Sequence, residues 1–156
     1  MLKVWTASSW ERCFPNEGPP EEFKSSVKLD AARNEAESAQ IFLRGDHAFC
    51  IRNLRVEGLD GLSVTLRFLD TISFRDGIEY PDPLSNSSVC EVRENVTQGI
   101  WITVRVPAAA AVGEYSGSVQ MDTSEGEIAV PVSVHVHRVC IPDGRNAAFS
   151  LEYWVN

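Results

Sequence analysis

The feature that most constrains the fold is a strict alternation of apolar and polar side chains between Glu127 and His137. Aliphatic β-branched residues occupy every second position of this run: Ile128, Val130, Val132, Val134 and Val136. Successive side chains of a β-strand point to opposite faces, so the run predicts one strand with an apolar stripe against a core. Pro131 cannot donate a ladder hydrogen bond, which predicts an edge position or a local irregularity there.

Two more alternating runs precede this strand, at residues 100–106 and 115–121. Together with the run at residues 127–137, they predict a meander of strand, loop, strand, tight turn and strand. Counting the weaker runs as well, we expect about eight to ten short strands and little or no helix. This pattern favours an all-β fold, a two-sheet antiparallel β-sandwich that is immunoglobulin-like or jelly-roll-like.

The first half of the chain is less regular. Arg52-Asn53 is a candidate β-bulge because the apolar parity changes across it, and Asp70 marks an expected bend. Short strands are also expected at residues 23–30 and 40–44. Residues 31–38 are the stretch with helix-forming composition, and at one or two turns such a helix is marginal.

A cluster of turn-forming residues from Cys140 to Asn146 is typical of the exit from a domain. An apolar and aromatic run, residues 149–156, follows it. We therefore expect a β-sandwich domain over residues 1–146 and the truncated start of a following domain over residues 147–156.

Charge and targeting signals narrow the class of partner. The net charge is −8 and basic residues form no run, which argues against a nucleic-acid or anionic-membrane surface. The N-terminus shows no apolar leader segment, so we expect the cytoplasm, or secretion if a leader has been removed. The four cysteines are isolated from one another and form no C-x-x-C pair, and we expect reduced thiols.

Few residues form a pattern that could carry catalysis. Glu35 and Glu37 would share one face of an extended segment, but a solvated turn that caps backbone groups explains them better. His135 and His137 share one strand face, and His47 alone remains as a further imidazole, so exposed strand histidines are the favoured interpretation. No phosphate-binding loop or nucleophile motif occurs. We therefore expect no metal, no cofactor and no catalysis by this chain.

Four stretches carry a family resemblance. They are similar to segments of the N-terminal domain of glycoside hydrolase family 123 and of related uncharacterised proteins. In chain order they are Ala32–Gln40, Tyr80–Leu84, Gly99–Pro107 and Val112–Val119. One departure is Ala39, because the family more often has an aromatic residue before the glutamine.

This resemblance implies an N-terminal β-sandwich followed by a (β/α)8 barrel that releases N-acetylgalactosamine from glycosphingolipid-type sugars. An adjacent Asp-Glu pair in the barrel supports attack by the substrate's own acetamido group, and no residue of that pair maps onto this chain. The run from Phe149 would correspond to the strand that enters the barrel. The implied role is a non-catalytic accessory domain that packs against its own C-terminal catalytic barrel, with the sugar specificity left open.

Several residues are candidates for the contact between domains or for structural ties. Pro81 and Pro83 restrict the backbone around Asp82 toward an extended, rigid loop. The full set of candidates is Arg33, Asn34, Glu35, Gln40, Asp82, Pro83, Trp101 and Tyr115. We further expect that the fragment self-associates through residues 81–84 and 149–155.

The alternative is a free-standing carbohydrate-binding module, which predicts a row of exposed aromatic side chains on one face or at one end. Four tryptophans are candidates for that role, although packing under a loop or against a second domain is commoner. They are Trp5, Trp10, Trp101 and Trp154.

Overall fold

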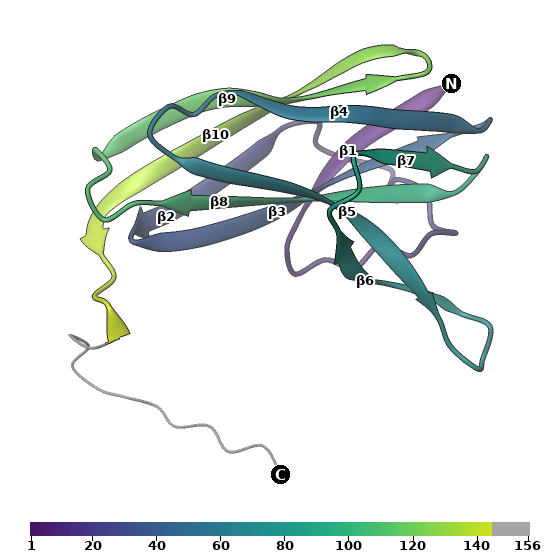
Figure 1. Cartoon of the computed structure of the whole chain (residues 1–156), viewed down its shortest axis with the longest axis horizontal. Helices are drawn as coiled ribbons and strands as arrows, with labels where there is room; N and C mark the ends of the chain where they lie inside the picture. The colour runs from purple at the N-terminus through teal and green to yellow at the C-terminus, as the bar shows by residue number, and fades with distance from the viewer. Residues whose placement is uncertain (145–156) are drawn as a thin grey trace.

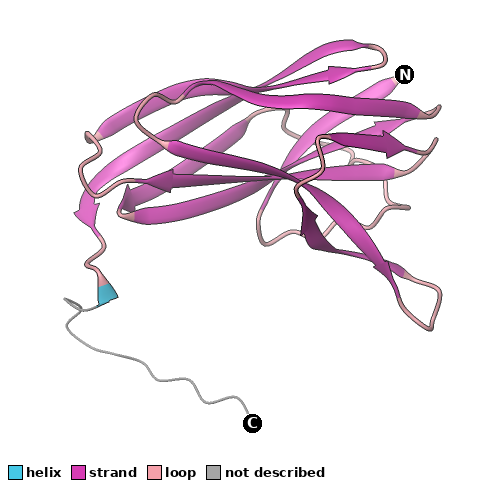
Figure 2. Cartoon of the chain, viewed as in Figure 1, coloured by secondary structure: helices cyan, strands magenta, loops and turns pink. Residues whose placement is uncertain are grey.

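The computed structural model describes residues 1–144, which are almost entirely strand and loop (Figure 2). Ten strands form two five-stranded sheets that face each other (Figure 1). The first sheet has the order β1-β3-β8-β5-β6, with bounds Leu2–Ser8, Glu35–Gly45, Thr97–Val106, Ser63–Ser73 and Glu79–Ser85. The second has the order β2-β10-β9-β4-β7, with bounds Val27–Arg33, Gly126–Cys140, Gly113–Thr123, Phe49–Gly58 and Val89–Val92. The all-β, two-sheet sandwich expected from the alternation is confirmed.

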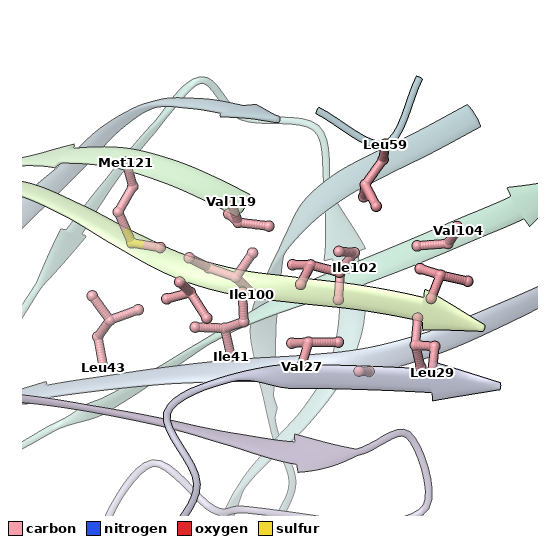
Figure 3. Close-up of a cluster of buried hydrophobic side chains, with 14 of the residues drawn as sticks. Val27, Leu29, Ile41, Leu43, Leu59, Ile100, Ile102, Val104, Val119 and Met121 are labelled. Atoms are coloured by element: carbon pink, nitrogen blue, oxygen red, sulfur yellow. The ribbon is translucent and has the colours of Figure 1, made fainter. Parts of the chain in front are cut away.

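The core lies between the sheets and is built mainly from alternate positions of the central strands (Figure 3). In β8 the inward side chains are Ile100, Ile102, Val104 and Val106, all fully buried. The stripe of valines in β10 faces them from the second sheet. Burying one such side chain stabilises the fold by about 1.5–3 kcal/mol, so these two stripes supply much of the driving force for folding.

The pairing of β10 with β2 is parallel, whereas the other strand pairs within residues 1–144 are antiparallel. β2 follows β1 through residues 9–26 and lies in the other sheet, so no hairpin dictates its direction. Its ladder with β10 begins at the Val27–Val132 pair. β10 is therefore open on this side at Pro131, which fits the local edge position expected there.

A sharp corner at Asn34 replaces the marginal helix expected at residues 31–38, and that expectation is wrong. β2 ends at Arg33 in the second sheet and β3 begins at Glu35 in the first, so one residue makes the crossing. Asn34 has a φ of 60°, in the left-handed region that Asn tolerates better than most residues. The two short strands expected on either side of it form parts of β2 and β3.

The predicted meander is correct at one connection and wrong at the other. β9 and β10 pair as a hairpin across Thr123 and Gly126. β8 and β9 do not pair, because residues 107–112 carry the chain from the first sheet to the second. Alternation identifies a strand and its buried face but carries no information about its neighbour.

Residues 80–84 were expected to form a rigid loop, and this is also wrong, since they lie within the edge strand β6. β6 pairs only with β5, so prolines are tolerated on its open side. The bulge expected at Arg52-Asn53 is confirmed by a register shift between Arg52 and Arg55, and Asn53 has a φ of 51°. The expected bend at Asp70 coincides with a second shift between Leu69 and Thr71.

The crossing from β4 to β5 places an apolar side chain in the core through an unusual backbone conformation. Leu59 follows the last residue of β4, has a φ of 59° and is 3% exposed. Its N–H donates to the carbonyl of Ser116 at 3.2 Å. Gly58 pairs with Gly117 across the ladder, and the absence of side chains at both positions lets the two backbones approach closely.

The boundary expected after residue 146, with a barrel-entry strand in residues 147–156, lies outside the described residues. Within residues 1–144 no helix is long and apolar enough to cross a membrane.

Candidate binding groove on the outer face of the first sheet

The outer face of the first sheet carries a second apolar cluster. Its buried members are Trp5 of β1, Phe42 of β3 and Leu69 of β5, each on the face opposite the main core. The rings of Trp5 and Phe42 lie 5.5 Å apart between centroids. Trp101 of β8 packs against this cluster and is partly exposed. Apolar side chains on the outer face of a sheet are unfavourable in water unless other residues cover them.

The cover is the segment that joins β1 to β2, residues 9–26, which we call the strap. Outward-facing polar side chains of β3 hold it through its backbone carbonyls. Gln40, 4% exposed, donates from Nε2 to the carbonyls of Ser8 and Glu11, both at 2.7 Å. Arg44 donates from Nη1 to the carbonyls of Pro15 at 3.2 Å and Glu17 at 3.0 Å. The strap is thus fixed on the sheet although it has no regular secondary structure.

β8 adds two further features beneath the strap. The N–H of Thr97 donates to the carbonyl of Pro15 at 2.8 Å, and its hydroxyl donates to that of Glu17. Gly99 leaves room for the cluster, because a Cβ there would lie 2.4 Å from Leu69 Cδ1 and 3.1 Å from Phe42 Cε1. Thr97 therefore helps to hold the strap, and Gly99 makes room for the apolar cluster beneath it.

Two adjoining hollows lie between the strap and β6, and together we call them the groove. The first has a volume of about 250 Å³, and its lining includes Trp10, Gln40 and Trp101. The second has a volume of about 300 Å³, and its lining includes Phe74, Asp76 and Tyr80. Arg12, Pro81 and Asp82 line both, so the hollows form one continuous surface.

Two aromatic side chains, Phe74 and Tyr80, line the second hollow. The ring centroid of Tyr80 lies 5.6 Å from that of Phe14 and 5.1 Å from that of Phe74, both edge-to-face. Phe74 is 57% exposed, and Trp10 on the far side of Arg12 is 94% exposed. Exposed large aromatics concentrated in one place are characteristic of a binding surface.

A larger hollow of about 1100 Å³ lies along the strap and shares Trp10 and Arg12 with the groove. Its lining includes Phe23, Lys24, Lys28, Asp30 and Glu37, a mixture of both charges without a convergent set of ligands. The groove is the better candidate because it combines aromatic faces with a small number of polar groups.

The eight candidate residues predicted from the sequence lie in three parts of the structure. Gln40, Asp82 and Trp101 line the first hollow, and Pro83 lies beside Asp82 in β6. Tyr115 lies elsewhere, where its hydroxyl donates to the carbonyl of Ala111 at 2.9 Å and fastens the crossing from β8 to β9. This contact resembles the tyrosine corner of Greek-key sandwiches.

The remaining three candidates lie where β10 ends. Arg33 Nη2 donates to the carbonyl of Arg138 at 3.1 Å. Asn34 Nδ2 donates to the carbonyl of Ile141 at 2.8 Å and to Asp143 Oδ1 at 3.1 Å. The side chain of Glu35 accepts from the N–H of Ala32 at 2.6 Å across the corner. These contacts are partly or fully exposed, and Gln40 alone of the eight candidates is a buried polar side chain.

On the outer face of the second sheet, His135 and His137 each contact a single carboxylate and do not form a site. His135 lies 2.5 Å from Glu114 and His137 lies 3.2 Å from Asp30, measured between ring nitrogen and carboxylate oxygen. Within the part of the chain that the structure describes, no three acidic, histidine or cysteine side chains are placed to hold a metal ion.

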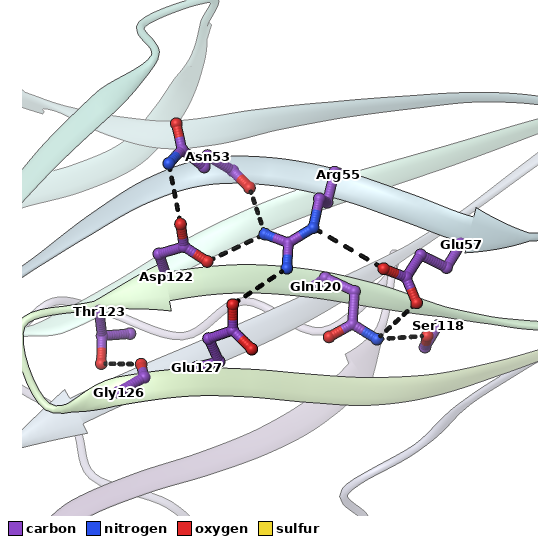
Figure 4. A network of polar contacts seen from close by, with 9 residues as sticks. All are labelled: Asn53, Arg55, Glu57, Ser118, Gln120, Asp122, Thr123, Gly126 and Glu127. Atoms are coloured by element: carbon purple, nitrogen blue, oxygen red, sulfur yellow. Dashed lines mark hydrogen bonds and ion pairs between the residues drawn. The ribbon is translucent and has the colours of Figure 1, made fainter.

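A network around Arg55 covers the neighbouring part of this face (Figure 4). Arg55 Nη1 lies 2.9 Å from Asp122 Oδ1, and Asn53 Nδ2 donates to the other oxygen at 2.8 Å. These hydrogen bonds lower the pKa of Asp122. The groups are solvent-exposed and satisfy one another, which is typical of a hydrated sheet face.

The reactivity of the Cys13 thiol can report whether the strap is closed over the sheet. Cys50 and Cys90 lie on paired strands but face opposite sides, because Cys90 is opposite Ile51. Burial raises the pKa of the Cys13 and Cys90 thiols to about 11, and the nearby Glu17 carboxylate adds to the shift at Cys13. Cys140 is exposed. A raised pKa keeps the thiol protonated and unreactive at neutral pH.

At pH 8 we expect alkylation of Cys13 and Cys90 to be slower than that of Cys140 by about 10²-fold, the loss of thiolate that such a pKa implies. Iodoacetamide labelling with site-resolved mass spectrometry measures the rates, and Cys140→Ser identifies the fast site. Equal rates at Cys13 and Cys140 would show that the thiol of Cys13 is not buried between the strap and the sheet.

Sequence reasoning missed Arg12 and Phe74, which line the groove, and Phe14, whose ring packs against that of Tyr80. Arg12 and Asp82 are far apart in the chain, and the strap has no periodicity that would place it on a sheet face. The sequence signal for this surface was the isolated Trp10. It was a candidate for sugar stacking, but the sequence did not show where in the fold it lies. Of the others, Trp5 is buried, and Trp154 lies outside the described residues.

Comparison with known proteins identifies a related domain. Residues 68–123, from the end of β5 through β9, match the family described as glycoside hydrolase 123 N-terminal domain. A family 123 glycoside hydrolase from Clostridium perfringens, solved in a study of glycolipid glycan hydrolysis, is similar in fold, with a TM-score of 0.75 and 14% identity. The match covers 91% of this chain and 28% of that enzyme. The resemblance predicted from the sequence is confirmed.

More distant sandwiches also match. A C. elegans MSP family member, WR4, has 9% identity and a TM-score of 0.40 over 72% of this chain and 93% of its own. The cohesin–dockerin complex Coh-OlpA-Doc918 from Clostridium thermocellum has 12% identity and a TM-score of 0.42 over 71% of this chain and 95% of its own. Scores this low carry no argument. No curated protein matches the chain.

Proposed function

We propose that this chain is a non-catalytic accessory domain of a glycoside hydrolase and packs against a catalytic domain that follows it in the parent protein. The main support for this proposal is the match with the Clostridium perfringens enzyme, which covers 91% of this chain but 28% of that enzyme. The sandwich therefore corresponds to one part of a much larger enzyme. The (β/α)8 barrel and the release of N-acetylgalactosamine belong to this proposal, which the family match supports.

The surface at the end of β10 supports a contact with a following domain. Three aliphatic side chains are exposed there: Val112 at 50%, Val139 at 65% and Ile141 at 39%. The contacts of Arg33 and Asn34 fasten the backbone of this segment to the corner between β2 and β3. A fixed backbone that presents apolar side chains is suited to packing against a neighbouring domain.

In the parent protein, Val139→Asp should weaken the contact between the domains. We expect the thermal unfolding of the catalytic domain to separate from that of the sandwich and to shift down by several degrees, because a charge would be buried in the interface. In residues 1–156 alone the same substitution should change the free energy of unfolding by less than about 0.5 kcal/mol, since Val139 is exposed.

Val89→Asp is the matched control, because Val89 is 43% exposed and lies on the edge strand β7. It should leave the coupling between domains intact. Identical calorimetric profiles for both variants and the wild type would contradict the proposed contact, and a parent protein without glycosidase activity would contradict the function.

Self-association of residues 1–156 belongs to the same proposal, since a surface meant for another domain is open in this chain. Sedimentation velocity at rising concentration measures it, and a strictly monomeric profile would count against it. We also propose the cytoplasm as the location, where the four free thiols would stay reduced. A secretory leader in the parent reading frame would contradict that location.

A further inference from the structure

We propose that the groove between the strap and β6 binds a neutral sugar ring, by stacking on its aromatic side chains and by hydrogen bonds from Arg12 and to Asp82. This binding belongs to the sandwich itself and does not require a catalytic domain. A pyranose has the matching chemistry, with an apolar C–H face and a rim of hydroxyls that both donate and accept hydrogen bonds.

The size of the groove fits one ring. Its hollows measure about 250 Å³ and 300 Å³, at the lower end of the range for small-molecule sites. The two hollows meet at Arg12 and Asp82, so a ring placed in one can reach the polar pair from either side.

The aromatic side chains provide the stacking surface. Phe74 and Trp10 are the most exposed of them, and Tyr80 is held between Phe14 and Phe74 by edge-to-face contacts. Exposed aromatic side chains that gather in one place are more typical of a ligand-binding surface than isolated ones. Stacking of an apolar sugar face would remove this area from water without needing a charge on the ligand.

The charged groups of the groove can hydrogen-bond the hydroxyls of a sugar. Arg12 and Asp82 line the same hollows, and neither forms an ion pair or a hydrogen bond with another side chain in residues 1–144. A carboxylate accepts from hydroxyls and a guanidinium donates to them, so the pair offers both kinds of partner. Glu11 and Asp76 add two further carboxylates to the lining, which disfavours an anionic ligand.

The groove is also held in shape before any ligand binds. The strap side is fixed by the buried amide of Gln40, and the β6 side contains two prolines that restrict its backbone. Preformed walls reduce the entropic cost of binding.

The test uses the 156-residue chain and four monosaccharides: glucose, galactose, N-acetylglucosamine and N-acetylgalactosamine. Titration with ¹H–¹⁵N correlation spectra should give a dissociation constant of about 1 mM for at least one of them, as expected for a single ring. The shifted amides should belong to residues 10–14 and 74–84.

Arg12→Ala, Asp82→Ala and Phe74→Ala should each weaken binding about tenfold or more with little change in thermal stability, because these side chains are exposed. Asp60→Ala, an exposed carboxylate in the turn between β4 and β5, is the control and should bind normally. No shift with any of the sugars at 50 mM would overturn the proposal. So would undiminished binding by Asp82→Ala, or equal binding of phosphate or choline used as charged probes. None of these outcomes depends on whether the parent protein is a glycosidase.

Discussion

Gly117→Ala should lower the free energy of unfolding by about 3 kcal/mol, the upper range for an overpacked site. A Cβ at this position would lie 2.4 Å from the carbonyl oxygen of Glu57 and 2.9 Å from Leu59 Cγ. The first of these is a backbone atom of the paired strand, so no side-chain rotation can relieve the contact. The strands would have to separate where Leu59 enters the core.

Urea denaturation monitored by circular dichroism measures this loss as a lower midpoint at unchanged slope. Gly18→Ala is the matched control, because a Cβ there meets nothing within 4 Å. Removing a glycine from an open loop position should leave the stability unchanged or slightly raised. If both variants had the same midpoint, the close approach of β4 and β9 at Gly117 would be refuted.

Gln40→Leu should release the strap. The substitution removes both donors from the carbonyls of Ser8 and Glu11, and a partly buried carbonyl left without a partner costs at most about 1–3 kcal/mol. The protein can avoid that cost by letting the strap open to water. We therefore expect local opening in addition to a lower global stability.

Cys13 reports on this opening because it lies on the strap and its thiol is partly buried. Its alkylation rate should rise at least tenfold in Gln40→Leu, while the rate at Cys140 stays the same. Gln120→Leu is the control, since the amide of Gln120 contacts only the side chains of Ser118 and Glu57 on the outer face of the second sheet. An unchanged rate at Cys13 would mean that other contacts hold the strap without Gln40.

The strands were predictable because their signal is local. The valine stripe of β10 and the parity change at Asn53 are read from neighbouring residues, and both are found in the structure. The choice of partner is not local. β8 and β9 show similar alternation yet lie in different sheets, and the parallel pairing of β2 with β10 joins segments about a hundred residues apart.

The groove was less accessible to sequence reasoning than the fold. Asp82 and Trp101 were named as candidates, but their common neighbour Arg12 comes from the strap. The position of the strap depends on hydrogen bonds from Gln40 and Arg44 to its backbone carbonyls. A single side-chain amide gives no periodic signal. Segments of irregular backbone are therefore placed by tertiary contacts that a one-dimensional pattern does not contain.

The fastening of Ile141 to Asn34 has a mechanical consequence. Met1 and the end of β10 lie at opposite ends of the sandwich, so a pull between them runs along the strands (Figure 1). Such a pull loads the ladders of β10 with β2 and β9 in shear, where many hydrogen bonds must break together. We therefore expect the sandwich to unfold at a higher force under this pull than under a pull across its strands.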